Sequence, residues 1–139
     1  LDFFKKINDT WGHAMGDQVL IAVSGLLSSS IRKVDLVGRI GGEEFAILIT
    51  DTNQRGCERV AEHIRESIEQ LPVPGWTDIH GRITASIGCA PVHPAGTLHA
   101  ALQMADDALY VSKKRGRNQV TLSNTPDALV APTTSDTVA

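Results

Sequence analysis

Residues 39–49 read Arg-Ile-Gly-Gly-Glu-Glu-Phe-Ala-Ile-Leu-Ile, and the rest of the chain is arranged around this stretch. Its two adjacent glycines, Gly41 and Gly42, predict a tight turn, because glycine reaches positive φ without a steric penalty. Apolar residues flank the turn on both sides. The stretch therefore predicts a β-hairpin with strands over roughly 34–40 and 44–50.

Glu43 and Glu44 begin the second strand of this hairpin. In a regular strand, the period of two would send the two side chains to opposite faces of the sheet. At the turn itself the backbone twists, so both carboxylates could reach a common metal ion. The alternative is a solvated hairpin tip in which the two glutamates have no chemical role.

The composition indicates one folded domain without a strong overall charge. The chain has 139 residues, of which 42% are hydrophobic and 21% are charged, as in soluble globular proteins. The net charge of −3 gives no sign of nucleic acid binding, so any phosphate site must come from local Lys and Arg clusters. Cys57 and Cys89 lack metal-ligand spacing and are expected to be buried free thiols in a reducing cytoplasm. No apolar run is long enough to span a bilayer, so we expect no membrane contact by this domain.

Apolar periodicity predicts helices alternating with strands. Helices are expected to begin near Asp17, after a cap at Thr52 or Asn53, and after a cap at Thr97. The turn-rich residues 8–16 are expected to separate the first of these helices from one short helical turn.

Further strands are expected within 79–91, where the pattern is clearest over 83–88, and over 118–122. Together with the hairpin, these elements predict an α+β fold in which helices pack on a mixed sheet, with the strand order left open. Residues 123–139 shift to Thr, Ser, Pro, Asp and Ala, and we expect them to form a disordered tail or linker.

Five blocks of the sequence resemble the GGDEF-domain diguanylate cyclases, in their Gly-Gly-Glu-Glu-Phe variant. The blocks are GGEEF at 41–45, DFFKKIND at 2–9, GHAMGD at 12–17, SIG at 86–88, and ADDALYVSK at 105–113 followed by GRN at 116–118. The resemblance covers residues 1–122, which it identifies as a catalytic domain that is truncated at its N-terminus. It implies a ferredoxin-like nucleotidyl-cyclase palm, with a central, mostly antiparallel sheet flanked by helices and the hairpin at the active site.

The resemblance also implies a reaction. Two GTP molecules would condense into cyclic di-GMP with release of pyrophosphate, with Mg²⁺ or Mn²⁺ as cofactor and one GTP held by each subunit of a homodimer. Such phosphoryl transfer depends on positioning and charge stabilisation, which carboxylate-bound divalent cations supply. The expected location is the cytoplasm, with any membrane anchor outside this domain.

Each matched residue then has an expected role. Glu43 would be a metal ligand and general base, and Glu44 would support the metal. The family's metal-binding Asp aligns one position before Leu1, so Leu1 would offer its backbone carbonyl and Asp2 would be the second, non-ligating acid. The chain by itself is therefore expected to bind GTP poorly and to make no product.

The substrate would be read by residues near the N-terminus. Lys5 matches a lysine beside the transferred phosphate. Asn8 and Asp17 match the guanine readers, because a carboxylate accepts from the N1–H and N2–H₂ edge while an amide offers a donor and an acceptor. His13 would lie close to the substrate. Without the resemblance, Asn8 would be a turn residue, Asp17 a helix N-cap and His13 a structural loop residue.

The phosphates would meet Gly41 and Gly42 at the turn, and Lys113 and Arg117 at a helix end. Lys113 and Arg117 are four residues apart, a spacing that puts both on one side of a helix. The alternative for this pair is a charge pair that favours the helix dipole.

Arg32 and Asp35 match the family's product-inhibition motif. Arg can lie over a guanine face and form a fork to phosphate, while Asp accepts from the base edge. Two other functions remain open. One is a GGDEF-type domain that binds GTP or cyclic di-GMP without turnover, and the other is a purine nucleotide cyclase, which Asn8 and Asp17 disfavour.

Overall fold

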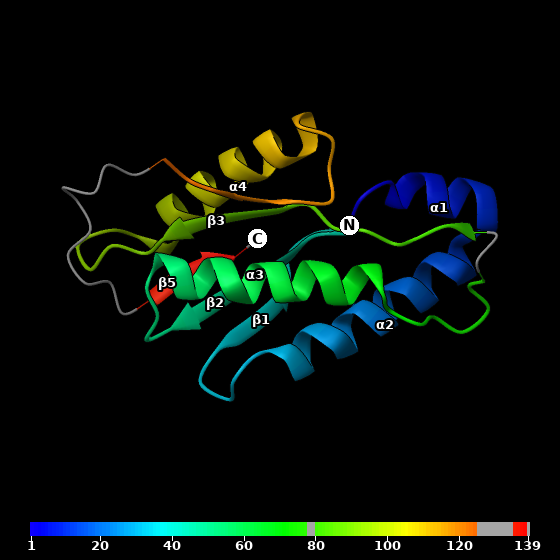
Figure 1. The fold of residues 1–139 in the computed structure, drawn as a ribbon, viewed down its shortest axis with the longest axis horizontal. Helices are drawn as coiled ribbons and strands as arrows, with labels where there is room; N and C mark the ends of the chain where they lie inside the picture. Colours follow the sequence, from blue (N-terminus) through cyan, green and yellow to red (C-terminus); the bar gives the residue numbers. More distant parts are fainter. Residues whose placement is uncertain (78–79, 125–134, 139) are drawn as a thin grey trace.

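The computed structural model describes residues 1–77, 80–124 and 135–138, which form four helices and five strands (Figure 1). In chain order these are α1 (Phe4–Trp11), α2 (His13–Ser30), β1 (Leu36–Arg39), β2 (Phe45–Thr50), α3 (Gln54–Glu69), β3 (Ile87–Pro91), α4 (Leu98–Lys114), β4 (Val120–Leu122) and β5 (Ser135–Val138).

The strands form one sheet in the order β1-β2-β5-β3-β4. Every neighbouring pair is antiparallel except β3 and β4, which are parallel. Helices α2 and α3 lie on one side of the sheet and α4 lies on the other (Figure 1). The predicted α+β fold, with a mostly antiparallel sheet flanked by helices, is confirmed.

The hairpin is present where residues 39–49 predicted it, with Arg39 opposite Phe45. The Arg39 guanidinium donates to the carbonyls of Gly41 at 3.1 Å and Gly42 at 2.7 Å and so closes the turn. Neither glycine has positive φ, so the conformational reason for the pair is wrong. Space is a reason for glycine only at Gly41, where a Cβ would lie 2.7 Å from the Glu44 carboxylate, whereas Gly42 faces open space.

The prediction of a turn-rich segment over residues 8–16 is also wrong. Helix α1 continues to Trp11 and α2 begins two residues later, with only Gly12, at φ 88°, between them. Gly16 lies inside α2, where a Cβ would come within 1.9 Å of the Asn8 side-chain oxygen. Of the two glycines that suggested a turn, Gly16 serves the close packing of α1 on α2, and Gly12 links the two helices through its positive φ.

Both predicted helix caps are confirmed. Asn53 accepts from the Gly56 backbone N–H at 2.9 Å, and Thr97 accepts from the Ala100 N–H at 3.1 Å. Strand β3 (Ile87–Pro91) lies within the predicted 79–91 but begins only near the end of residues 83–88, where the pattern was clearest.

The prediction of a disordered tail is wrong for residues 135–138, because β5 lies between β2 and β3 and pairs antiparallel with both. Strands β2 and β3 do not pair with each other, so each would otherwise present an open row of backbone donors and acceptors. The part of that predicted tail over residues 125–134, together with residue 139, lies outside the described residues.

Helix α4 packs directly on the backbone of β3. Ser112 is fully buried in α4, and its hydroxyl donates to the Ile87 carbonyl at 3.0 Å. A Cβ on Gly88 would lie 2.0 Å from the Ala105 carbonyl oxygen and 2.4 Å from the Leu109 nitrogen. Because these are backbone atoms, they cannot move aside as a flexible side chain would.

Gly88→Ala should therefore lower the free energy of unfolding by about 3 kcal/mol or more, since overpacking against helix backbone cannot be relieved by rotamer changes. The control is Gly25→Ala on the exposed face of α2, where nothing lies within 4 Å of the added Cβ. That change should stabilise the protein by up to about 1 kcal/mol through helix propensity. Urea unfolding followed by circular dichroism measures both, and equal effects at the two positions would contradict the packing of α4 on β3.

Candidate active site

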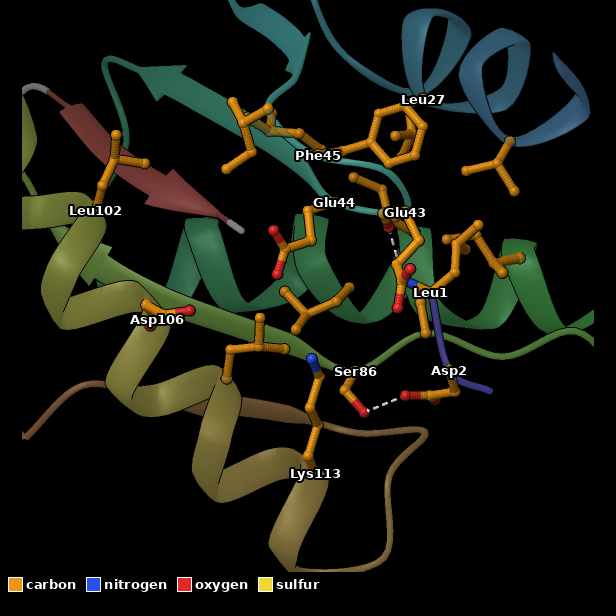
Figure 2. Close-up of a pocket in the computed structure, with 18 of the residues that line it drawn as sticks. Leu1, Asp2, Leu27, Glu43, Glu44, Phe45, Ser86, Leu102, Asp106 and Lys113 are labelled. Carbon is orange, nitrogen blue, oxygen red and sulfur yellow. Dashed lines mark hydrogen bonds between the residues drawn. The ribbon is translucent and has the colours of Figure 1, made fainter. Parts of the chain in front are cut away.

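A pocket of about 250 Å³ opens between β2 and β3 beside the hairpin turn (Figure 2). Its walls are mostly apolar and come from α2, α3, α4 and the two strands. Five charged side chains also line it: Asp2, Glu43, Glu44, Asp106 and Lys113. The pocket therefore joins an apolar interior to a charged mouth.

Glu43 and Glu44 both line this pocket, as the twisted-turn prediction required. They precede Phe45, the first residue of β2, so the strand period that would separate them does not yet apply. Leu1 lies beside them, and its nitrogen donates to the Glu43 carbonyl at 2.9 Å. The structure thus brings Leu1, Glu43 and Glu44 together at one end of the pocket.

These residues offer hard oxygen ligands to a cation. Among the described residues, no group of three or more His, Cys, Asp or Glu side chains could hold a metal ion. Mg²⁺, however, is usually bound through one or two protein carboxylates together with substrate phosphates. Two adjacent glutamates that line one pocket fit that donor set.

Lys113 reaches the pocket from the opposite wall. Figure 2 shows its amino group and the Glu44 carboxylate pointing into the pocket, from α4 and from the hairpin. Two further α4 residues, His99 and Asp106, line the pocket and were not singled out from the sequence. The spacing of seven from His99 to Asp106 to Lys113 puts all three on one helix face, and this was the signal that could have identified them.

The predicted guanine readers lie apart from this pocket, on α1 and α2. The Asn8 side chain packs against Gly16, and Asp17 is the next residue of α2. Asp17 lies inside the helix and is exposed, so it is not an N-cap. His13 is the exposed first residue of α2 rather than a loop residue.

Lys5 also lies outside the pocket. Its side chain is 88% exposed, and its ammonium pairs with Asp9 one helical turn later, at 2.9 Å. An exposed pair of this kind contributes at most about 1 kcal/mol, so the ammonium is readily released to another anion.

Arg117 does not share a helix face with Lys113 as its spacing predicted. Helix α4 ends at Lys114, and Arg117 follows in a turn with φ 66°. Its guanidinium lies over the Phe3 ring, 4.5 Å from the ring centre. The helix ends before the spacing of four can apply, because Gly116 adopts φ 114°.

Arg32 and Asp35 form a second site outside the pocket. The Asp35 side chain is only 2% exposed, and it accepts from the Arg32 guanidinium at 3.1 Å and from the Thr50 N–H at 2.9 Å. Burial would raise the pKa of Asp35, but the hydrogen bonds from Arg32 and Thr50 outweigh it and hold the pKa at about 2. The Asp35 oxygens face the protein in this structure, and the predicted contact of Asp35 with a guanine edge stays a prediction. Arg32, whose side chain is 54% exposed, is the residue that a ligand can reach.

Within residues 1–77, 80–124 and 135–138, no helix is both long enough and apolar enough to cross a bilayer.

Comparison with known proteins gives consistent matches. A sequence profile described as "Diguanylate cyclase, GGDEF domain" matches residues 1–119. The probable diguanylate cyclase DgcT of Escherichia coli is 40% identical over 135 residues, which cover 95% of this chain and 30% of that protein. The response regulator PleD of Caulobacter vibrioides is 43% identical over 125 residues, which cover 86% of this chain and 27% of that protein. The chain spans less than a third of either relative.

Solved structures share the fold. The GGDEF domain of DgcB from Caulobacter crescentus, crystallised in complex with c-di-GMP, superposes with a TM-score of 0.80 at 33% identity, covering 89% of this chain and 74% of that one. The active GGEEF domain of a diguanylate cyclase from Vibrio cholerae gives a TM-score of 0.75 at 30% identity, covering 90% and 79%.

The depressed pKa of Asp35 makes a stability prediction. Its carboxylate is more acidic in the folded chain than the ordinary value of 3.8, so its stabilising effect is full above pH 4 and is lost as pH falls toward 2. Asp35→Asn should lower the free energy of unfolding by about 2 kcal/mol at pH 7. The difference from the unmutated protein should shrink between pH 4 and pH 2 in thermal or urea unfolding.

Asp9→Asn is the matched control, because Asp9 pairs with Lys5 at an exposed position. It should change the free energy of unfolding by less than about 0.5 kcal/mol at any pH. A pH-independent effect of Asp35→Asn would contradict the role assigned to the Asp35 carboxylate.

Proposed function

The chain belongs to the GGDEF-domain family of diguanylate cyclases, and from this premise we propose that it condenses two GTP molecules into cyclic di-GMP. Each 3′-oxygen forms a bond to the α-phosphorus of the other GTP, each α–β bridging bond breaks, and two pyrophosphates leave. The observation that carries the proposal is the meeting of Glu43, Glu44 and Lys113 at one pocket, with the two glutamates on the hairpin and the lysine on α4.

Glu43 and Glu44, with the Leu1 carbonyl, would hold Mg²⁺ or Mn²⁺. Such an ion, when bound, neutralises phosphate charge and lowers the pKa of a nearby hydroxyl. Glu43 is half-buried at the mouth of the pocket and is our candidate for the base that takes the 3′-hydroxyl proton.

Lys113 enters the pocket opposite the glutamates, where it would pair with the β- and γ-phosphates. Lys5 would leave its exposed pair with Asp9 to stabilise charge on the α-phosphate. Arg117, whose guanidinium lies over Phe3 in the structure, would add a second phosphate contact.

Guanine would be read on α1 and α2. Asn8 and Asp17 lie on neighbouring faces of these helices because Asn8 packs against Gly16, the residue before Asp17. An amide and a carboxylate together match the donor and acceptor edge of guanine, and adenine lacks the paired donors. His13 opens α2 on the same exposed surface.

We further propose that catalysis takes place in a homodimer in the cytoplasm. One pocket per chain would hold one GTP, and the product contains two guanylate units. Two facing protomers would therefore supply the second 3′-hydroxyl.

We also propose product inhibition at Arg32. The exposed guanidinium can lie over guanine and pair with phosphate, while buried Asp35 holds it in place. This assigns ligand contact to Arg32 and orientation to Asp35.

Glu43→Gln tests the catalytic proposal. In the full-length protein with GTP and Mg²⁺, the rate of cyclic di-GMP formation should fall on the order of a hundredfold or more, a barrier increase of roughly 3 kcal/mol. The amide keeps the shape of the side chain but loses the charge that holds a cation. Product is measured by chromatography with mass detection.

Glu58→Gln is the control, because Glu58 is exposed on α3 and lies outside the pocket. It should leave the rate unchanged. If Glu43→Gln keeps a rate within about tenfold of the unmutated protein, Glu43 is neither a metal ligand nor the general base. If the unmutated protein binds GTP or cyclic di-GMP but makes no product, the alternative of a binding module without turnover is correct.

Arg32→Lys tests the inhibitory site while keeping a positive charge beside buried Asp35. It should weaken cyclic di-GMP binding by about tenfold, roughly 1.4 kcal/mol, because lysine cannot form the planar fork. The initial rate with GTP should not change. Calorimetry measures the first quantity, and undiminished binding of cyclic di-GMP would refute the assignment.

A further inference from the structure

The buried carboxylate of Asp2 has no role in the chemistry above, although Asp2 lines the active-site pocket. Asp2 is only 4% exposed. It accepts hydrogen bonds from Ser86 Oγ at 2.6 Å, from Thr84 Oγ1 at 2.8 Å and from the Asn118 N–H at 3.1 Å (Figure 2 shows the bond from Ser86). These three donors replace the water that the carboxylate loses on burial.

Asn118 belongs to a strained turn. The backbone has positive φ at three successive residues: 114° at Gly116, 66° at Arg117 and 45° at Asn118. Two of them are not glycine, and such residues keep this conformation only where their surroundings hold them. Asp2 holds the Asn118 N–H, and the Arg65 guanidinium donates to the Asn118 side-chain oxygen at 3.0 Å.

This turn sets the position of Arg117, whose guanidinium lies over Phe3. Phe3 directly follows Asp2, has φ 54° and precedes the first residue of α1. The Asp2 carboxylate therefore joins the start of α1 to the turn that follows α4. These two elements carry Lys5 and Lys113, the cations assigned to opposite ends of the triphosphate.

We propose that Asp2 is a positioning residue that fixes the start of α1 against the exit of α4, so that their cationic side chains are correctly spaced for a nucleoside triphosphate. The proposal rests on the function proposed above. Its geometry also disfavours Asp2 as a metal ligand, because three of about four acceptor sites are taken: Oδ1 accepts from Ser86 while Oδ2 accepts from Thr84 and Asn118.

The test is Asp2→Asn in the full-length protein, since an amide cannot accept from all three donors. Amide hydrogen exchange of the segment 115–119, followed by mass spectrometry without nucleotide, should become about tenfold faster, the ratio expected for loss of one hydrogen bond. KM for GTP should rise by about tenfold, and the Mg²⁺ concentration for half-maximal rate should stay unchanged.

Asp107→Asn is the matched control, because Asp107 is exposed on α4 and lies outside the pocket. It should change none of the three quantities. Ser86→Ala removes one donor and keeps the carboxylate, so it should give the same changes at smaller size. If Asp2→Asn does not fold, the Ser86→Ala variant tests the proposal by itself.

The outcomes separate the two proposals. Unchanged exchange at 115–119 overturns the positioning role, and so does faster exchange with unchanged KM. A raised Mg²⁺ requirement with unchanged exchange makes Asp2 a metal ligand and also overturns it. If the unmutated protein makes no cyclic di-GMP, the proposed function fails, and exchange together with GTP affinity, measured by calorimetry, still decides the role of Asp2.

Discussion

Two backbone hydrogen bonds at the start of the chain hold the active-site elements together. The Leu1 nitrogen donates to the Glu43 carbonyl, and the Asp2 nitrogen donates to the Thr84 carbonyl, each at 2.9 Å. The first bond attaches the hairpin turn to the N-terminal segment. The second attaches the N-terminal segment to Thr84, in the segment that leads into β3. The glutamates therefore reach a pocket whose far wall is α4. The position of the hairpin glutamates relative to the segment before β3 depends on this bridge.

The packing of the helices sets how the charges are arranged. Gly88 lets α4 lie directly on β3, which brings Lys113 to the pocket, and Gly16 lets α2 lie against Asn8. Both glycines act through the space they leave and not through an unusual φ. A chain with a net charge of −3 can in this way present local cations to phosphate, while the carboxylates of Glu43 and Glu44 lie at the hairpin.

The hairpin, both helix caps and the fold class follow from sequence patterns, because they depend on local turn chemistry and apolar period. That Glu43 and Glu44 both reach one pocket could be expected from the twist of the backbone at the turn. It holds because both residues precede Phe45, the first residue of β2. The stacking of Arg117 on Phe3 could not, since a turn at Gly116 overrides the helical spacing. Nor could the burial of Asp35, whose partner Thr50 is 15 residues away. Long-range contacts decide these positions, and a local pattern does not encode them.

The most direct test of the account is to identify the products that the full-length protein forms from GTP and Mg²⁺. The account predicts cyclic di-GMP and pyrophosphate in a ratio of one to two, because each of two GTP molecules loses one pyrophosphate. The products are identified by mass, and pyrophosphate release is followed in the same sample. A folded protein that binds GTP but yields neither product, or that yields a cyclic mononucleotide, would contradict the central claim.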